Sequence, residues 1–283
     1  MNSHAKLRAS PKKVRVIEPA SSWLSIDWME LWDYRDLLYF LVWRDIKVRY
    51  AQSALGIGWA VIQPVFFMIV FTFVFGELAK IDSDGVPYPI FSFAALVPWT
   101  YFATSMTGAT ESLISNARML SKVYFPRLMM PFSAVLARLI DFAIALLLLL
   151  ALMVWFKTIP SIWALILPVV TIIMILSATG AGMWLTALAI QYRDIKYGIS
   201  FAVQLLMFTS PVVYPASLVP DEYRLVYAIN PMVGVIESFR SALLTTNPMP
   251  WDLLGMSILV ATILFISGLV YFRRTERIFA DVA

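Results

Sequence analysis

The chain has 283 residues, of which 60% are apolar and only 14% are charged. A soluble domain cannot bury that much apolar surface, so we expect its main solvent to be lipid and exclude a cytosolic enzyme. The absence of cysteine excludes disulfide bonds and thiol chemistry. The formal charge of +4 does not require nucleic acid, because basic loops that orient a membrane protein give the same excess.

Residues 1–27 form a polar, basic segment that we expect to be a flexible arm. The first 20 residues have no apolar core, so we expect no cleaved signal peptide. Over residues 28–50, aromatic and aliphatic residues recur every three or four positions with charged residues between them. This spacing predicts an amphipathic helix at the headgroup level of a membrane, followed by a short loop at 51–56.

Six apolar runs follow, each long enough for a helix that crosses the hydrocarbon core. The runs are residues 58–75, 90–109, 132–156, 161–190, 198–219 and 253–272. Charged residues, Arg138 and Asp141, occur only in the third run. The runs do not alternate polar and apolar residues as a barrel wall does. The sequence therefore predicts an all-α, polytopic membrane protein with six transmembrane helices.

Lys and Arg residues indicate which ends of these helices face the cytoplasm. All but four of the 22 basic residues lie in the N-terminal segment, in the second and fourth connections with their flanks, or at the C-terminus. The four exceptions are Lys80, Lys157, Arg224 and Arg240. The positive-inside rule then places both termini in the cytoplasm.

Two of the connections between the apolar runs have sequence patterns that predict further helices. The second, residues 111–131, has apolar spacing that fits a short cytoplasmic helix. In the last outer connection, residues 233–246 are framed by Asn-Pro pairs and are too short to cross a membrane. They predict a surface or re-entrant helix, on which Glu237 and Arg240 are spaced to form an ion pair.

Motifs of enzyme chemistry are missing from the sequence. There is no P-loop, so we expect no ATP site in this chain. The only histidine is His4, so we expect no metal site. The Asp82-Ser-Asp84 triplet matches a short motif of nucleotide-sugar enzymes, which we attribute to chance. We predict no catalytic residue and no cofactor.

Polar and small residues within the runs leave alternatives open. Arg138 and Asp141 form either a mutual pair or the lining of a water-filled cavity. Ala178 and Gly182 predict close helix packing. Aromatic residues near the run ends mostly fit an interfacial belt, while a few could line a conduit in which flat rings stack on sugars. The conduit candidates are Trp99, Tyr101, Phe102, Trp184, Phe208 and Tyr214.

One stretch resembles a known family. It contains Arg44, Asp45, Lys47, Arg49, Tyr50, Ser53, Leu55, Gly56 and Trp59, followed by Pro64. This stretch is similar to the signature of polysaccharide-export permeases, the membrane subunits of type-2 ABC exporters of O-antigen, capsule and teichoic acid chains. Tyr192-Arg193-Asp194 and Asn230-Pro231 support the resemblance, which covers residues 28–275.

The resemblance implies a homodimer in a bacterial inner membrane, paired with two copies of a separate ATPase that binds ATP and Mg. It implies a lipid-linked polysaccharide of the undecaprenyl type as substrate, surrounded by membrane lipids and without nucleic acid. The chain would then divide into the arm (1–27), an interface helix with an entrance loop (28–56), a six-span domain (57–275) and a cytoplasmic tail (276–283).

The resemblance also implies roles for particular residues. The substrate entrance would comprise Lys47, Arg49, Tyr50, Leu55, Gly56, Trp59, Arg118 and Lys122. Coupling to the ATPase would involve Trp32, Arg35, Asp36, Arg44, Asp45, Arg118, Arg193 and Asp194. Glu237 and Arg240 would form an outer gate. Cations at the entrance agree with a diphosphate substrate, since phosphate groups bind best to Arg and Lys.

Two other readings stay open from the sequence. One is a related permease for a small lipid or a drug, and the other is an integral-membrane enzyme acting on lipid-linked sugars. O-antigen, capsule and teichoic acid are not distinguished by any residue named above.

Overall fold

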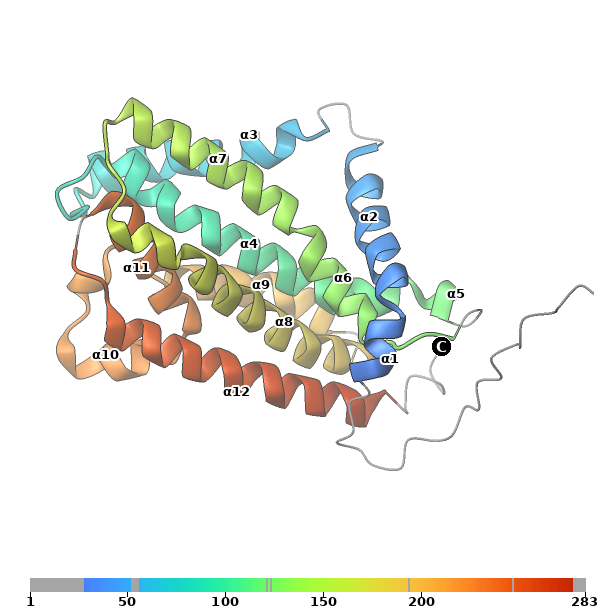
Figure 1. The fold of residues 1–283 in the computed structure, drawn as a ribbon. Coiled ribbons are helices and arrows are strands. Elements are labelled where there is room, and N and C mark those ends of the chain that lie inside the picture. Colours follow the sequence, from blue (N-terminus) through green and yellow to red (C-terminus); the bar gives the residue numbers. More distant parts are fainter. Residues whose placement is uncertain are drawn as a thin grey trace, which may run out of the picture.

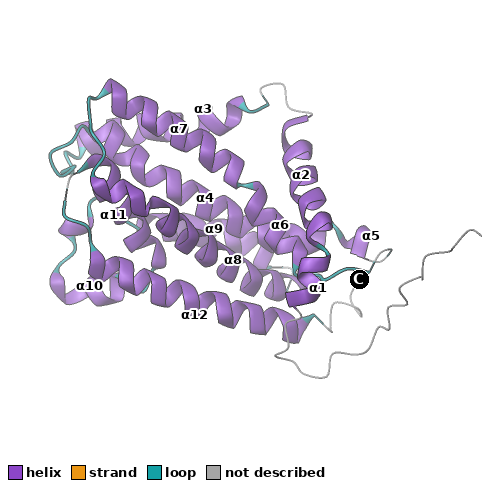
Figure 2. Cartoon of the chain, viewed as in Figure 1, coloured by secondary structure: helices purple, strands orange, loops and turns teal. Residues whose placement is uncertain are grey.

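The computed structural model describes residues 28–51, 56–120, 122, 124–192, 194–245 and 247–276. All regular elements in these ranges are helices, and the ranges contain no strand (Figure 2). The predicted all-α class is therefore confirmed for the described part of the chain. The arm at 1–27, Leu55 and Arg193 lie outside it.

The first half of the fold contains the N-terminal helices and three long helical segments. It contains α1 (Trp28–Asp33), α2 (Arg35–Ala51), α3 (Gly58–Phe71), the π-helix η1 (Thr72–Leu78), α4 (Tyr88–Ser115), α5 (Ala117–Leu120), α6 (Met129–Ala137) and α7 (Leu139–Trp155). The second half contains η2 (Ile162–Ile166), α8 (Leu167–Gln191), α9 (Ile195–Phe208), η3 (Ala216–Leu218), α10 (Asp221–Tyr227), α11 (Pro231–Leu244) and α12 (Trp251–Thr275).

Among the residues that the structure describes, four helical segments are long and apolar enough to cross a membrane. They are Gly58–Leu78, Met129–Trp155, Ile162–Gln191 and Trp251–Thr275. These segments agree with the first, third, fourth and sixth predicted runs. The helices of the second and fifth runs, α4 and α9, are not among them, so a count of six spans stays a prediction.

The second run forms α4, which lies at the centre of the bundle (Figure 1) and packs against α3, α6, α7, α8 and α11. Most of its 28 residues are buried. Several of its Ser and Thr hydroxyls donate to carbonyls within the helix; for example, Thr110 Oγ1 donates to the carbonyl of Met106 at 2.8 Å, whereas the buried Ser105 hydroxyl has no such partner among the described residues. A helix surrounded by protein needs no lipid-facing apolar surface, which accounts for its lower hydropathy.

The fifth run is shorter as a helix than predicted. We expected residues 198–219 to span, but α9 ends at Phe208. Pro211 follows, and a proline disfavours helical geometry at the residue before it and supplies no N–H donor. The 14 residues of α9 extend about 21 Å at 1.5 Å per residue. That length falls short of a hydrocarbon core of about 30 Å.

The third run is not one continuous helix. A turn at Arg138 separates α6 from α7, and the Arg138 N–H bonds the carbonyl of Val135 at 3.2 Å, three residues back. The break places the Arg138 side chain beside the first turn of α7. The first run also changes form, because Ala79 N–H bonds the carbonyl of Val74, a π-type step of five residues.

The α2 helix crosses one end of the bundle, where it packs against α6 (Figure 1). We call this the α2 end, and the opposite end, with α10 and α11, the far end. The described chain begins and finishes at the α2 end. The predicted helix at 28–50 is divided by a turn at Tyr34 into α1 and α2. Leu41 is buried against the bundle, whereas Tyr39 and Trp43 stay exposed.

Glycines let three helices approach closely. A Cβ on Gly182 would lie 2.6 Å from Ala109 Cβ of α4, so the predicted close packing is confirmed there. A Cβ on Gly180 would lie 2.6 Å from the backbone nitrogen of Phe265 in α12. Gly268 of α12 packs in turn on the Gly180 carbonyl. The small residues therefore set the separation of α4, α8 and α12.

The far end is closed by α11, whose bounds differ by two residues from the predicted 233–246. The side chain of Asn230 accepts a hydrogen bond from Met232 N–H at 3.0 Å and caps the helix. Thr245, with φ of 57°, ends it in the left-handed conformation. Asp84 accepts hydrogen bonds from Asn247 at 2.9 Å and Ser217 at 3.3 Å. This aspartate therefore joins loops of the far end.

The second connection also differs from its prediction. We expected one short helix within residues 111–131, but α4 continues to Ser115, Ala117–Leu120 forms a separate turn of helix, α5, and α6 begins at Met129. The extension of α4 brings Glu111 and Ser112 to a cavity that is also lined by Arg44 and Asp45 of α2.

Candidate functional site

A carboxylate between two arginines marks the α2 end of the bundle. Asp141 Oδ2 accepts from Arg49 Nη1 at 2.5 Å and lies 3.6 Å from Arg138 Nη1. The Tyr50 hydroxyl donates to Asp141 Oδ1. Each of the three charged side chains is about a quarter exposed. The pairing of Arg138 with Asp141 that we predicted is confirmed, and Arg49 and Tyr50 join it.

Local structure explains why these groups meet. Arg49 and Tyr50 lie in the last turn of α2, where the helix dipole favours a cation. Asp141 lies in the first turn of α7, where the dipole favours an anion. The turn at Arg138 allows its guanidinium to approach the same carboxylate, three residues further along the chain. The cluster thus joins α2, the predicted interface helix, to α7.

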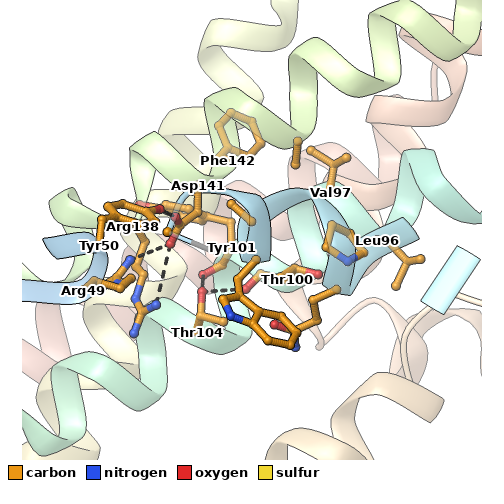
Figure 3. Close-up of a pocket in the computed structure, with 16 residues that line it drawn as sticks. Arg49, Tyr50, Leu96, Val97, Thr100, Tyr101, Thr104, Arg138, Asp141 and Phe142 are labelled. Atoms are coloured by element: carbon orange, nitrogen blue, oxygen red, sulfur yellow. Dashed lines mark hydrogen bonds and ion pairs between the residues drawn. The ribbon is translucent and has the colours of Figure 1, made fainter. Parts of the chain in front are cut away.

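A cavity of about 170 Å³ opens beside this cluster, between α2, α3, α4 and α7 (Figure 3). Arg49, Tyr50, Arg138 and Asp141 lie at one side of it and Leu96 and Val97 at the other, while Phe142 lies beside Asp141. Thr100, Thr104 and Gln63 also line it. The cavity therefore combines a charged mouth with an apolar wall, as sites for amphiphilic ligands do.

A second cavity of about 480 Å³ adjoins the first and shares Arg49 and Arg138 with it. Its walls come from α2, α4 and α6, and include Arg44, Asp45 and Glu111. Arg44 and Asp45 are paired at 2.8 Å. The two cavities form a polar zone under α2, so the alternative of a wet cavity lining at Arg138 and Asp141 agrees with the geometry.

The predicted entrance residues divide into two groups. Arg49, Tyr50, Gly56 and Trp59 line the first cavity. The exposed cations Lys47, Arg118 and Lys122 line neither cavity. Leu55 lies outside the described residues.

Sequence reasoning missed Gln63, Thr100 and Thr104 as lining residues. No motif singles them out, because hydroxyl residues recur along α4 and only the packing of α3 against it selects those two. The signal for Arg138 and Asp141 was present, since they are the charged pair of an apolar run.

The six conduit candidates are not brought together in this chain. Trp99 and Phe102 are each 4% exposed and belong to the core, while Tyr101 borders the first cavity. Trp184 stacks on Tyr271 with ring centroids 4.1 Å apart. Phe208 is half exposed, and its carbonyl accepts from the Tyr214 hydroxyl at 3.1 Å. A conduit lined by these residues stays a prediction.

The residues predicted for ATPase coupling lie mostly on the surface of the α2 end. Trp32, Arg35, Asp36, Arg118 and Asp194 are exposed, whereas Arg44 and Asp45 are partly buried and paired with each other. Arg193 lies outside the described residues. The coupling role itself stays a prediction.

The predicted outer-gate residues form a buried ion pair at the far end. Arg240 Nη1 lies 2.9 Å from Glu237 Oε1, which confirms the predicted pairing. Arg240 also donates to the carbonyls of Phe91, Val212 and Tyr214, and its guanidinium lies 3.6 Å from the ring centre of Phe91. These contacts fasten the segment after α9 to α11. Whether the pair acts as a gate stays a prediction.

Residues 36–244 match the family described as ABC-2 type transporter. The chain belongs to the ABC-2 type transporter family. The matched range runs from the first turn of α2 to the end of α11, so it includes both cavities and the Glu237–Arg240 pair. The resemblance to type-2 exporter permeases inferred from residues 44–59 is thereby confirmed.

Curated relatives of this ABC-2 chain are named for O-antigen export or polysialic acid transport. It is 33% identical over 215 residues to the O-antigen export system permease protein RfbA of Myxococcus xanthus, covering 75% of this chain and 82% of that protein. It is 26% identical over 248 residues to RfbA of Klebsiella pneumoniae, covering 87% and 95%. It is 25% identical over 249 residues to the polysialic acid transport protein KpsM of Escherichia coli, covering 82% and 91%.

Proposed function

We propose that this chain is the permease subunit of an ATP-driven exporter that moves a lipid-linked polysaccharide, O-antigen in the first instance, across a bacterial inner membrane. The observation that carries the proposal is the similarity to the O-antigen permease of Myxococcus xanthus over three quarters of the chain. The cavity with a charged mouth and an apolar wall supports it, because a lipid-linked substrate has the same two kinds of surface.

In this proposal the chain acts as a homodimer and two copies of a separate ATPase supply the energy. The absence of a P-loop from the sequence supports a separate motor. The exposed side chains of Trp32, Arg35 and Asp36 on α1 and α2 suit a docking surface at the end of the bundle. Both termini would lie in the cytoplasm, on the side where the ATPase and its nucleotide are found.

Export in cells tests the proposal. The gene is expressed with its ATPase in a strain that lacks its own permease, and surface O-antigen is measured by immunoblotting. Arg49→Ala and Gly56→Trp should abolish export, because both residues line the first cavity and Gly56 has a positive φ of 48°. Arg224→Met, which alters an exposed pair at the far end, is the control. Normal surface polysaccharide in both cavity variants would contradict the proposal.

A capsule polysaccharide is the second candidate cargo. The similarity to the polysialic acid transport protein KpsM favours it, although at lower identity. Complementation of an O-antigen export strain and a capsule export strain with the same gene separates the two cargoes. Restoration of capsule alone would replace O-antigen in the proposal and leave the permease role standing.

A further inference from the structure

The C-terminal end of α12 is bonded to the second connection. Arg127, in the segment between α5 and α6, donates from Nη1 to the carbonyl oxygen of Glu276 at 2.7 Å, 149 positions further along the chain. The last carbonyl groups of a helix have no intrahelical donor, and the helix dipole favours a cation beside them. Arg273 Nη1 pairs with the Glu276 carboxylate at 3.2 Å. Arg127 therefore caps α12 from a distant part of the sequence.

A buried apolar cluster joins the same two segments. Phe125 and Leu128, on either side of Arg127, belong to one cluster with Phe272 in the last turns of α12. Leu41 of α2 is buried in this cluster as well. The buried residues of the main core form a different cluster. The second connection, α2 and the end of α12 thus share a small core at the α2 end.

The second connection also contributes to the exposed surface of the α2 end. Arg118 in α5, Lys122 and Tyr124 are exposed, and all three precede Arg127 in the same connection. In the proposed function the ATPase docks at this end of the bundle. The segment that would meet the ATPase is therefore the one that holds α12.

The α12 helix runs from the α2 end to the far end of the bundle (Figure 1). Its 25 residues extend about 37 Å at 1.5 Å per residue. A Cβ on Gly268 would lie 2.5 Å from the Gly180 carbonyl oxygen of α8, and a Cβ on Gly234 of α11 would lie 2.3 Å from the Leu253 carbonyl oxygen. Closely packed interiors have low compressibility. A shift of α12 at the α2 end would therefore reach α11 at the far end.

We propose that Arg127 transmits movement of the second connection, driven by the ATPase, to α12 and through α12 to α11. Arg127 is a positioning residue in this scheme, because it acts through α12 rather than on the polysaccharide. The inference rests on the proposed ATP-driven export and adds the path by which movement at the α2 end reaches the far end. A residue that only capped α12 would affect folding and leave the coupling of hydrolysis to export unchanged.

Hydrogen exchange of the full chain in nanodiscs tests the contact itself. Arg127→Met should raise the exchange rate of the backbone amides in the last turn of α12 about fivefold, because one hydrogen bond that holds this turn is lost. The matched control is Arg274→Met, which removes an exposed cation from the same turn. Its effect should stay below about twofold, because exposed charges contribute little. Equal exchange in the two variants would overturn the proposal.

The complex of the chain with its ATPase tests the transmission. Arg127→Met should co-purify with the ATPase and hydrolyse ATP at close to the wild-type rate. Surface polysaccharide in cells should fall about tenfold, as expected when a coupling free energy of ordinary size is lost. Arg127→Lys keeps the charge and a donor, so it should restore part of the export. Arg274→Met should export normally.

The remaining outcomes separate this inference from the proposed function. Normal export by Arg127→Met would overturn the transmission step. Loss of folding, of ATPase binding, or of hydrolysis together with export, shared by Arg127→Met and Arg127→Lys, would overturn it too, because Arg127 would then only maintain the assembly. A wild-type complex that hydrolyses ATP and exports neither O-antigen nor capsule would count against the proposed function. The exchange measurement would still decide whether Arg127 holds α12.

Discussion

The buried pair at the far end gives the sharpest test of how this fold is held together. Arg240 is 1% exposed, and its partner Glu237 is 8% exposed. We predict that Arg240→Met, which keeps much of the apolar stem, will strongly destabilise the protein. The reason is that Glu237 is left as a buried charge without its cation, while three backbone carbonyls lose a charged donor.

The size of the effect follows from the burial of both partners. Removing one member of a buried ion pair costs about 3–5 kcal/mol. Removing both charges, in Arg240→Met with Glu237→Gln, should cost less than Arg240→Met alone, with a coupling free energy of about 1–3 kcal/mol. The control Arg224→Met breaks a 2.9 Å pair with Asp252 that is about half exposed. Such a surface pair is worth about 1 kcal/mol or less.

The measurement is the free energy of reversible unfolding in mixed micelles of a mild detergent and dodecyl sulfate. A cycle of the two single variants and the double variant isolates the coupling between Arg240 and Glu237. Equal losses in Arg240→Met and Arg224→Met would refute the reasoning, and so would a double variant that is less stable than Arg240→Met. Either result would mean that the Glu237–Arg240 pair does not stabilise the packing of the segment after α9 against α11.

Three further predictions test the packing, the orientation and one long-range bond. Gly180→Ala should lower the melting temperature and reduce the folded yield, because its Cβ meets the α12 backbone at 2.6 Å, whereas Gly255→Ala, with open space around it, should be neutral or slightly stabilising. The chain has no cysteine, so a single introduced cysteine reports which side of the membrane it lies on. An impermeant maleimide applied to intact cells should label Glu222→Cys and not Lys196→Cys. The reverse pattern would overturn the predicted orientation. Tyr88→Phe removes a buried 2.6 Å hydrogen bond to the carbonyl of Val213 and should cost about 0.5–1.5 kcal/mol in the same unfolding assay; an unchanged stability would show that the bond contributes nothing.

Local sequence patterns predicted the helical class and the four strongly apolar segments. Hydropathy summed over about 20 residues depends only on composition, so the packing of neighbours does not alter it. The same holds for the pair of Glu237 and Arg240, whose three-residue spacing brings them together on any helix. It also holds for the family, because residues 44–59 carry a motif that can be read without a structure.

Where helices end was harder to predict. The run at 198–219 reads as one apolar span, yet the helix stops at Phe208, because Pro211 and the contacts of Arg240 hold the next residues in turns. The run at 132–156 likewise reads as one helix and is broken at Arg138. Hydropathy does not register a single turn, since the residues on both sides of it remain apolar.

The sequence by itself determined that this chain is a helical membrane protein and which family motif it carries, and it predicts that both basic ends lie on one side of the membrane. Only the tertiary structure decided that Asp141 meets Arg49 and Tyr50, about 90 positions away in the chain, and that Thr100 and Thr104 face their cavity. Local interactions act over three or four residues and leave a pattern in the sequence, whereas a contact between distant segments depends on how whole helices pack.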